Sequence, residues 1–364
     1  MVYHPGFKIT DSFIYFYTDH KTNKVPASNL YITPSSETGS LNVMHLKRYW
    51  NKSILKREGK LPAGSLHDEW TMDTTLLKVL GLGLEQTMMY VYQESPSFEQ
   101  FETWIIRVSG TPHAEKVKQF NRLCSGGGAA KNDPSGAEVL TAGDLSFWEE
   151  NGYVIIKNAI SKADCDETIR VICDHIGIDR DAPGTWYNDH PSRQGIMVQF
   201  FQHPLLEKNR NSDRIRIAYE QLWKRTDLWV NTDRVGFNPP ETELYRFPGP
   251  RLHWDASIIQ PMPFGTQGIL YLADTTANQG AFTLVPGFQN RISEWLKNLP
   301  EGANPRQQDM YALGATPIAA NAGDFILWHQ ALPHGSSPNT STVPRFVQYI
   351  NYEPFDYKEN AVWL

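Results

Sequence analysis

A chain of 364 residues is long enough to bury a sizeable core, either as two domains or as one elaborated domain. Its formal net charge of −6 gives no basic surplus for nucleic acid, and no Lys/Arg run favours an anionic membrane surface. The most apolar window, residues 75–92, is interrupted by Lys78, Glu85 and Gln86, whereas a membrane-spanning helix needs roughly 20 mainly apolar residues. We therefore expect partners other than nucleic acid or membrane.

The cysteines and the N-terminus both indicate a reducing, cytoplasmic setting. Cys124, Cys165 and Cys173 are too few for a disulfide scaffold and lack a C-x-x-C spacing, so we expect them to pack as small apolar residues. The first residues do not combine a basic segment with an apolar one, so no signal peptide is expected.

Residues 1–123 are predicted to form an α-rich accessory region. Two aromatic and β-branched runs, 12–17 and 29–33, are candidates for a hairpin. The helices expected after them cover 41–57, 74–92 with Asp73 as N-cap, a stretch from Phe98 behind a Ser97–Gln100 capping box, and 113–123 behind Thr111-Pro112. We find no cluster of ligand-type side chains in this region, and the aromatic stripe at 98–105 is interpreted as core.

A Gly/Ser/Pro-rich segment, 124–143, is predicted to be a linker to a second domain, 144–364. Its Gly-Gly-Gly run lacks the Lys-Ser/Thr of a phosphate-binding loop. In the second domain we expect helices at 144–151, at 161–176 behind Ser161 and Asp164, and around 288–296, with a polar excursion at 299–314 that could form a lid.

Short strands dominate the rest of the second domain. They are bounded by Gly, Pro, Asn or Asp and are predicted at 153–157, 195–201, 227–237, 242–247, 268–273, 281–285, 315–319, 324–328 and 345–352. Such a series favours a sandwich or jelly roll over a parallel sheet.

The run Arg-Leu-His-Trp-Asp at 251–255 carries an imidazole and a carboxylate two positions apart. On an extended segment these side chains point to the same side, so His253 and Asp255 can hold one cation. Local capping or hydrogen bonding is the alternative interpretation. A second histidine would complete the two-histidine, one-carboxylate triad that leaves three positions open on iron(II), although a similar donor set also suits catalytic zinc.

Two downstream histidines compete for the third position. His329 ends the run Phe-Ile-Leu-Trp-His, whereas His334 precedes Gly-Ser-Ser-Pro-Asn and lies eleven residues before Arg345. The forked, permanently charged guanidinium of Arg345 suits a carboxylate, which a zinc hydrolase of this kind would not need. His334 is therefore the predicted ligand, and His329 is expected to be structural or to orient the ligands.

These motifs, in this order, resemble the phytanoyl-CoA dioxygenase family from about Asp144 to Glu353. The matching runs are Gly-Tyr-Val-Ile-Ile-Lys-Asn at 152–158, His253-Trp-Asp255, Gly280–Gly287, Gly323–His329, and His334–Asn339 through Arg345. The resemblance implies a double-stranded β-helix core (jelly roll, cupin-like) with flanking helices, mainly β, plus the N-terminal α-rich extension.

The resemblance also implies the cofactors and their residues. His253, Asp255 and His334 would bind Fe(II), while Arg345 and Ser336 would hold the distal carboxylate of 2-oxoglutarate, and Tyr271 would contact the same cosubstrate. O2 is the other cosubstrate. Gln199 faces either the pocket or the outer side of its strand.

The implied reaction is oxidation of an unactivated C–H bond in a small molecule such as an acid, an amino acid or a secondary metabolite. Hydroxylation is the simplest outcome, and desaturation or oxidative cyclisation are alternatives. Asp255 argues against halogenation, because related halogenases replace this carboxylate with a small residue. The competing classes are a non-catalytic metal-binding or scaffold protein and a zinc hydrolase. The N-terminal region is expected to pack on the core or at a homodimer interface.

Overall fold

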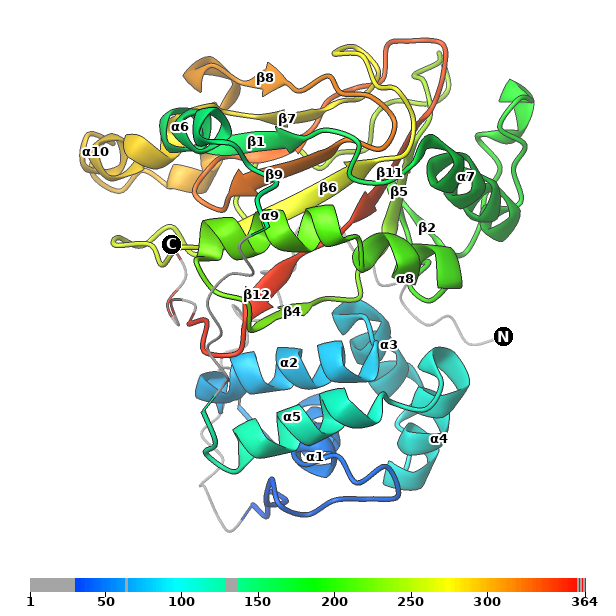
Figure 1. The fold of residues 1–364 in the computed structure, drawn as a ribbon, viewed down its shortest axis with the longest axis vertical. Helices are drawn as coiled ribbons and strands as arrows, with labels where there is room; N and C mark the ends of the chain where they lie inside the picture. The colour runs from blue at the N-terminus through cyan, green and yellow to red at the C-terminus, as the bar shows by residue number, and fades with distance from the viewer. Residues whose placement is uncertain (1–29, 63–64, 129–136, 359, 361, 363) are drawn as a thin grey trace.

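The computed structural model describes residues 30–62, 65–128, 137–358, 360, 362 and 364. In this part of the chain, two facing sheets lie above a layer of N-terminal helices (Figure 1). A short two-stranded sheet, β4 (Leu228–Val230) and β12 (Tyr352–Pro354), lies between the larger sheet and these helices. The sheets do not close into a barrel within the described residues. The helices described here include none that is long and apolar enough to cross a membrane.

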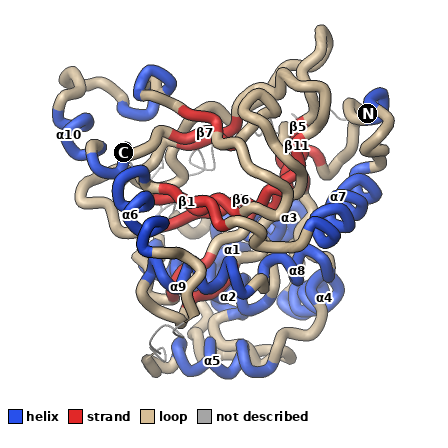
Figure 2. Tube along the Cα trace, turned by 45° about the horizontal axis from the view of Figure 1, so that its top comes forward, coloured by secondary structure: helices blue, strands red, loops and turns tan. Residues whose placement is uncertain are grey.

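The larger sheet has seven strands in the order β1-β9-β6-β11-β5-β3-β2, and every pairing is antiparallel. Their bounds are β1 Tyr153–Ile156, β2 Arg193–Gln194, β3 Met197–Val198, β5 Val235–Asn238, β6 Thr266–Tyr271, β9 Phe325–His329 and β11 Arg345–Tyr349. The smaller sheet has the order β10-β7-β8, with β7 Phe282–Leu284, β8 Thr316–Pro317 and β10 His334–Ser336. Figure 2 shows β7 in a layer separate from β1 and β6.

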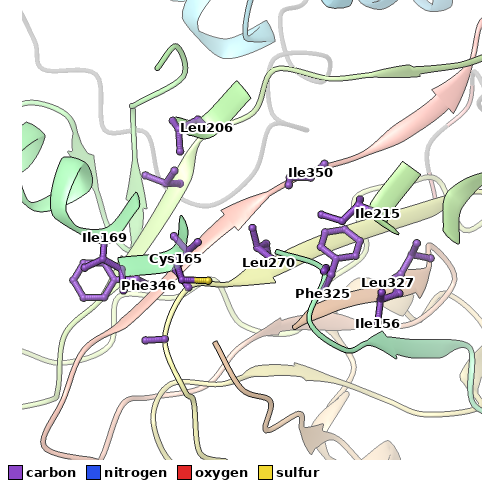
Figure 3. Close-up of a cluster of buried hydrophobic side chains, with 14 of the residues drawn as sticks. Ile156, Cys165, Ile169, Leu206, Ile215, Leu270, Phe325, Leu327, Phe346 and Ile350 are labelled. Atoms are coloured by element: carbon purple, nitrogen blue, oxygen red, sulfur yellow. The ribbon is translucent and has the colours of Figure 1, made fainter. Parts of the chain in front are cut away.

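The two faces of the larger sheet bury different cores, because successive side chains of a strand point to opposite faces. One face, with Leu270, Phe325 and Phe346, packs against helices in the cluster that Figure 3 shows. These helices are α7 Lys162–Ile176, α8 Pro204–Arg210 and α9 Asp213–Trp223. The other face, with Ile269 and Val347, packs toward the smaller sheet. Full burial of one such side chain contributes about 1.5–3 kcal/mol.

The N-terminal layer has its own apolar core around Leu76, Phe101 and Phe120. Its helices are α1 Leu46–Arg57, α2 Trp70–Leu80, α3 Leu84–Glu94, α4 Phe98–Ser109 and α5 Ala114–Cys124. This core includes Trp229 of β4 (Leu228–Val230), which pairs with β12 (Tyr352–Pro354). The layer therefore packs on the core of the same chain, which was one of the two places expected for it.

The single helix predicted for 74–92 is wrong, because the chain turns between α2 and α3. Gly81 ends α2 with a φ of 65°, a left-handed conformation that glycine adopts without steric cost. A Cβ on Gly83 would lie 2.6 Å from the Phe201 ring, so the turn brings the start of α3 against the second domain. The apolar periodicity continues through the turn and conceals it.

Asp73 lies inside α2 and is not an N-cap. It belongs to a buried charge cluster that the sequence analysis missed. Asp73 Oδ1 lies 2.8 Å from His45 Nε2 and 2.7 Å from Lys52 Nζ, and Lys52 also donates to Glu69 at 2.7 Å. His45, Glu69 and Asp73 are close enough to share a cation, but the Lys52 ammonium already supplies positive charge to both carboxylates.

The helix starts with capping signals were predicted well. Ser97 accepts from Gln100 N before α4, and Ser161 accepts from Asp164 N before α7. The helix expected from 144 begins earlier, as α6 (Ala142–Asn151) with Thr141 as N-cap, and the one expected after Thr111-Pro112 begins at Ala114. The excursion at 299–314 contains only the short turns η4 Pro305–Gln307 and η5 Tyr311–Leu313, and it follows η3 Phe288–Asn290 and α10 Ile292–Lys297.

The predicted strands at 227–237 and 345–352 each divide into two, β4/β5 and β11/β12. Each of these two segments passes from the two-stranded sheet to the seven-stranded sheet or back. The two crossing points lie side by side, because Asn231 N donates to Asn351 O and Asn351 N donates to Asn231 Oδ1. The strand expected at 242–247 is irregular, and β2 and β3 replace the single strand at 195–201. Of the predicted hairpin, 12–17 lies outside the described residues, and 30–33 forms no strand.

Candidate metal centre and cosubstrate pocket

Three predicted ligands lie together where the segment before β6 meets β10. The backbones of His253 and His334 exchange two hydrogen bonds of 2.9 Å, which brings the two imidazoles together with ring centroids 5.0 Å apart. Asp255 Oδ1 lies 3.1 Å from His253 Nε2, and Asp255 Oδ2 lies 3.2 Å from His334 Nε2. One ligand atom from each residue fits within 4.8 Å of the others, which is compact enough for one ion.

Each imidazole is oriented by a backbone carbonyl two residues earlier. His253 Nδ1 lies 2.7 Å from Arg251 O, and His334 Nδ1 lies 3.1 Å from Leu332 O. A proton on Nδ1 satisfies these contacts and leaves the Nε2 lone pair directed at the centre, as a metal ligand requires.

The carboxylate is held by a residue that sequence reasoning missed. Gln267 Nε2 on β6 donates to Asp255 Oδ2 at 2.7 Å, and Gln267 Oε1 accepts from Trp328 Nε1 at 3.2 Å. This chain of amide and indole fixes the direction of the carboxylate. No local motif signals Gln267, because its role depends on a strand pairing.

The electrostatics of the cluster favour an ionised carboxylate. Partial loss of hydration among the surrounding protein groups opposes the charge on Asp255, but contacts with His253 and His334 outweigh this and hold the pKa of the carboxyl well below its ordinary value. Burial lowers the pKa of His253, and the Asp255 carboxylate overcomes this, so the pKa is raised. The His334 side chain is only 6 % exposed, whereas those of His253 and Asp255 are 37 % and 51 % exposed. The cluster is thus open on one side.

His329 lies outside this cluster. Its Nδ1 accepts from Ala331 N at 3.0 Å, and its ring packs near Trp148 and Phe264. Burial lowers the pKa of His329 to about 4. His329 therefore packs among aromatic side chains, whereas His334 is the histidine that lies beside Asp255.

Arg345 provides the clearest sign of a missing partner. Its side chain is 0 % exposed, and none of its three guanidinium nitrogens has a hydrogen-bond partner among the described residues. Asn238, opposite Arg345 on β5, is also buried, and its Oδ1 is likewise unpaired within the described chain. An unpaired buried cation costs several kcal/mol, so an anionic, hydrogen-bonding partner would stabilise Arg345.

Tyr271 and Ser336, the other residues predicted to contact the cosubstrate, are both buried, and Tyr271 is close enough to Arg345 to feel its charge. The Tyr271 hydroxyl donates to Ile318 O and accepts from Phe282 N, both at 2.8 Å, which leaves one lone pair for a further contact. Burial raises the pKa of Tyr271 to about 12, although the nearby charge of Arg345 opposes the shift. Ser336 is buried on β10, two residues beyond His334.

The excursion at 299–314 contacts the ligand segment through Arg306. Its guanidinium donates to Trp254 O and Ala256 O, both at 2.7 Å, and to Leu364 O at 2.8 Å. The two carbonyls flank Asp255, so Arg306 fixes the backbone on both sides of that carboxylate. Sequence reasoning did not single out Arg306.

Comparisons with known proteins identify the family. The family model described as "Phytanoyl-CoA dioxygenase (PhyH)" matches residues 148–347. A putative phytanoyl-CoA dioxygenase of Dictyostelium discoideum is 25% identical over 258 residues, covering 57% of this chain and 74% of that protein. Phytanoyl-CoA dioxygenase domain-containing protein 1 of Danio rerio is 23% identical over 274 residues, covering 62% and 93%.

Two solved structures are similar to part of the chain. The non-heme alpha ketoglutarate dependent carbocyclase SnoK from nogalamycin biosynthesis has a TM-score of 0.43 and 17% identity, covering 61% of this chain and 88% of that one. HygX from Streptomyces hygroscopicus, with nickel, 2-oxoglutarate and hygromycin B bound, has a TM-score of 0.41 and 16% identity, covering 60% and 90%.

The family match covers more than half of the chain and includes the whole span from β1 to Arg345. It confirms the resemblance found in the sequence motifs. The chain therefore belongs to the phytanoyl-CoA dioxygenase (PhyH) family of oxygenases, which depend on Fe(II), 2-oxoglutarate and O2.

Proposed function

We propose that this enzyme holds Fe(II) with His253, Asp255 and His334 and the distal carboxylate of 2-oxoglutarate with Arg345. The observation that carries the assignment is the fully buried Arg345 guanidinium, whose nitrogens have no partner among the described residues. A carboxylate accepts two parallel bonds from such a fork. A zinc hydrolase or an inert scaffold would leave this charge without a use.

The donor set fits the family's metal. Two imidazole nitrogens and one carboxylate oxygen form the facial triad that suits Fe(II) with open positions, and the exposed side of the cluster provides access. When bound, Fe(II) together with 2-oxoglutarate and O2 supplies the oxidising chemistry for an unactivated C–H bond.

The protein's own residues position the reactants. His253 and His334 keep Nε2 directed inward through their carbonyl contacts, and Gln267 holds Asp255. Arg345 anchors the cosubstrate away from the cluster, and we assign supporting contacts to Ser336 and Tyr271. Hydroxylation is the simplest outcome, with desaturation or cyclisation set by substrate placement.

The same proposal covers the architecture. We assign the two facing sheets to the double-stranded β-helix class, residues 144–364 to the oxygenase domain, 124–143 to a linker and 1–123 to an accessory region. The free thiols of Cys124, Cys165 and Cys173 support a cytoplasmic enzyme. Its substrate is a small molecule, and neither nucleic acid nor membrane is a partner.

The metal assignment is tested with protein purified without oxygen. Wild-type protein should bind one equivalent of Fe(II), give the absorption band of an iron–2-oxoglutarate chelate, and release succinate when O2 is admitted. His253→Ala and His334→Ala should abolish both signals, while His329→Ala, the matched control, should keep them. Loss of iron binding in His329→Ala with retention in His334→Ala would show that the distal ligand is misassigned.

A further inference from the structure

A row of polar side chains crosses the face of the larger sheet that packs toward the smaller sheet. Val347 lies opposite Gly236, and two positions further along β11 Tyr349 N donates to Arg234 O just before β5. On β3, Met197 lies opposite Gly236, which places Gln199 beside Arg234 at the next position on the same face. Tyr349, Arg234 and Gln199 therefore form a row across three neighbouring strands.

This row is continuous with the proposed metal centre. Ile269 of β6 lies opposite Tyr349, and Gln267, two residues earlier on the same face, donates to Asp255. Burial raises the pKa of Tyr349, and the charges of Arg345, Arg234 and Asp255 are all close enough to contribute. In the antiparallel register Gln267 lies two residues further from the level of Arg345 than Ile269 does, so the row lies between the level of the cosubstrate anchor and that of the side chain that holds Asp255.

The N-terminal layer completes the row from outside the region that the family model matches. Glu85, in the first turn of α3, forms an ion pair with Arg234 and lies 3.4 Å from Gln199 Nε2. Figure 1 shows α3 at the edge of the helical layer nearest the sheet. Gln86 exchanges hydrogen bonds with Gln202, which fixes this end of α3 against the second domain.

One hydrogen-bond acceptor in the row is unused. Gln199 Nε2 donates to Gln194 Oε1 at 2.9 Å, but Gln199 Oε1 is buried and has no partner in the described part of the chain. Asp233 and Glu85 both contact Arg234, and a second guanidinium, that of Arg210, donates to Asp233 O at 2.7 Å. A buried acceptor without a partner, on a side chain next to the Glu85 carboxylate, favours a hydrogen-bond donor such as a hydroxyl or a protonated amine.

We propose that Gln199, Tyr349 and the Glu85–Arg234 pair form the substrate subsite, and that it takes the amine or hydroxyl end of a small molecule. The subsite rests on the proposed function, because it is defined by its place beside the metal ligands. Helix α3 supplies one wall of it, which gives the N-terminal layer a part in substrate selection. An ionised carboxylate has no proton to donate to Gln199 Oε1 and would leave that acceptor without a partner.

Three probes that share one ring test this chemistry: cyclohexylmethylamine, cyclohexylmethanol and cyclohexanecarboxylate. Each is titrated into the full chain with Fe(II) and 2-oxoglutarate, without oxygen, and followed by calorimetry and by the shift of the iron–2-oxoglutarate band. The amine should bind at least about tenfold tighter than the carboxylate, with the alcohol between them. Equal or tighter binding of the carboxylate, or failure of both donor probes to bind, would overturn the proposal.

Variants of Gln199 and Glu85 test whether these side chains cause the preference among the probes. Gln199→Leu should weaken amine and alcohol binding about tenfold and leave the band without probe unchanged. Glu85→Gln keeps the shape of the side chain and removes its charge, so it should remove the preference for amine over alcohol. It also provides a second test if Gln199→Leu does not fold. Gln93→Leu, an exposed glutamine on the same helix, is the matched control. Unchanged amine binding in both Gln199→Leu and Glu85→Gln contradicts the subsite.

The two proposals fail in different ways. Absence of the iron–2-oxoglutarate band in wild-type protein contradicts the proposed function. A normal iron–2-oxoglutarate band, together with equal affinities for the amine, alcohol and carboxylate probes, contradicts only the subsite.

Discussion

Single side chains around the three proposed ligands should set the strength of metal binding. Gln267 orients Asp255 through one hydrogen bond of 2.7 Å and is itself held by Trp328. Loss of such a supporting contact typically weakens metal binding about 10- to 100-fold. Gln267→Ala should therefore lower Fe(II) affinity by this factor, measured by competition with a chelator without oxygen. Gln119→Ala, at an exposed glutamine on α5, should leave the affinity unchanged, and an unaltered affinity in Gln267→Ala would show that the carboxylate needs no such support.

His329 predicts a specific pH dependence of stability. Burial holds its pKa at about 4 in the folded protein, against an ordinary value of 6.5. Between these values the unfolded chain binds a proton that the folded chain does not, so stability falls as the pH drops from about 6.5 toward 4. The difference corresponds to about 3 kcal/mol at most.

His329→Asn keeps an acceptor for Ala331 N and removes the titrating group. Urea unfolding of both proteins across this pH range should give a shallower loss of unfolding free energy for the variant. Parallel curves for wild type and variant would mean that His329 does not remain neutral in the folded state.

The segment at 299–314 is predicted to act on the metal site through Arg306. Its hydrogen bonds to Trp254 O and Ala256 O, on both sides of Asp255, connect this segment to the segment that carries the proposed ligands. Arg306→Ala should speed hydrogen exchange in residues 253–258 and weaken Fe(II) binding about tenfold, as expected for a lost charged donor. Arg291→Ala is the control, because Arg291 bonds to Leu313 O within the same region and not to the ligand segment. Equal effects of the two variants would reduce the role of Arg306 to general stability.

The elements that could be predicted are those with local signals. The caps at Ser97 and Ser161 depend on residues three positions apart, and the directions of His253 and Asp255 follow from alternation along one segment. The turn at Gly81 was missed although a glycine is a local signal for the end of a helix, because the apolar periodicity continues through it into α3. The division of β11 from β12 depends on pairing with β4 and β5.

The same distinction applies to the candidate site. His253, Asp255, His334 and Arg345 were predicted from spacing and motif order, and the fold brings the first three together. Arg306 reaches a carbonyl 52 residues away, and Glu85 reaches Arg234 from another layer of the molecule. Neither contact leaves a trace in local sequence, so only the folded chain shows them.

At the scale of the whole molecule, the N-terminal layer should be essential. Trp229 of β4 is buried in the core of that layer, and the pairs Lys78–Glu353 and Glu85–Arg234 link it to the second domain. Deletion of residues 1–135 would expose Trp229 and remove one charge of each pair, at a cost typical of broken partly buried pairs. We expect insoluble or inactive protein, measured by sedimentation and succinate release. A soluble fragment with full activity would contradict this view of the layer.

The central claim is that Arg345 anchors 2-oxoglutarate beside the three metal ligands. Removing one partner of a buried, charged pair costs on the order of 2–5 kcal/mol. This corresponds to a fall of roughly 30-fold to several-thousand-fold in affinity. Iron should stay bound in Arg345→Ala, because Arg345 lies outside the ligand cluster.

The most direct measurement is therefore a 2-oxoglutarate titration of Fe(II)-loaded protein without oxygen, followed by the chelate absorption band, for wild type, Arg345→Lys and Arg345→Ala. The predicted result is unchanged iron content with a steeply raised 2-oxoglutarate requirement in Arg345→Ala and an intermediate one in Arg345→Lys, which lacks the forked geometry. An alanine variant that saturates at the wild-type concentration of 2-oxoglutarate would contradict the role of Arg345 and with it the assigned cosubstrate pocket.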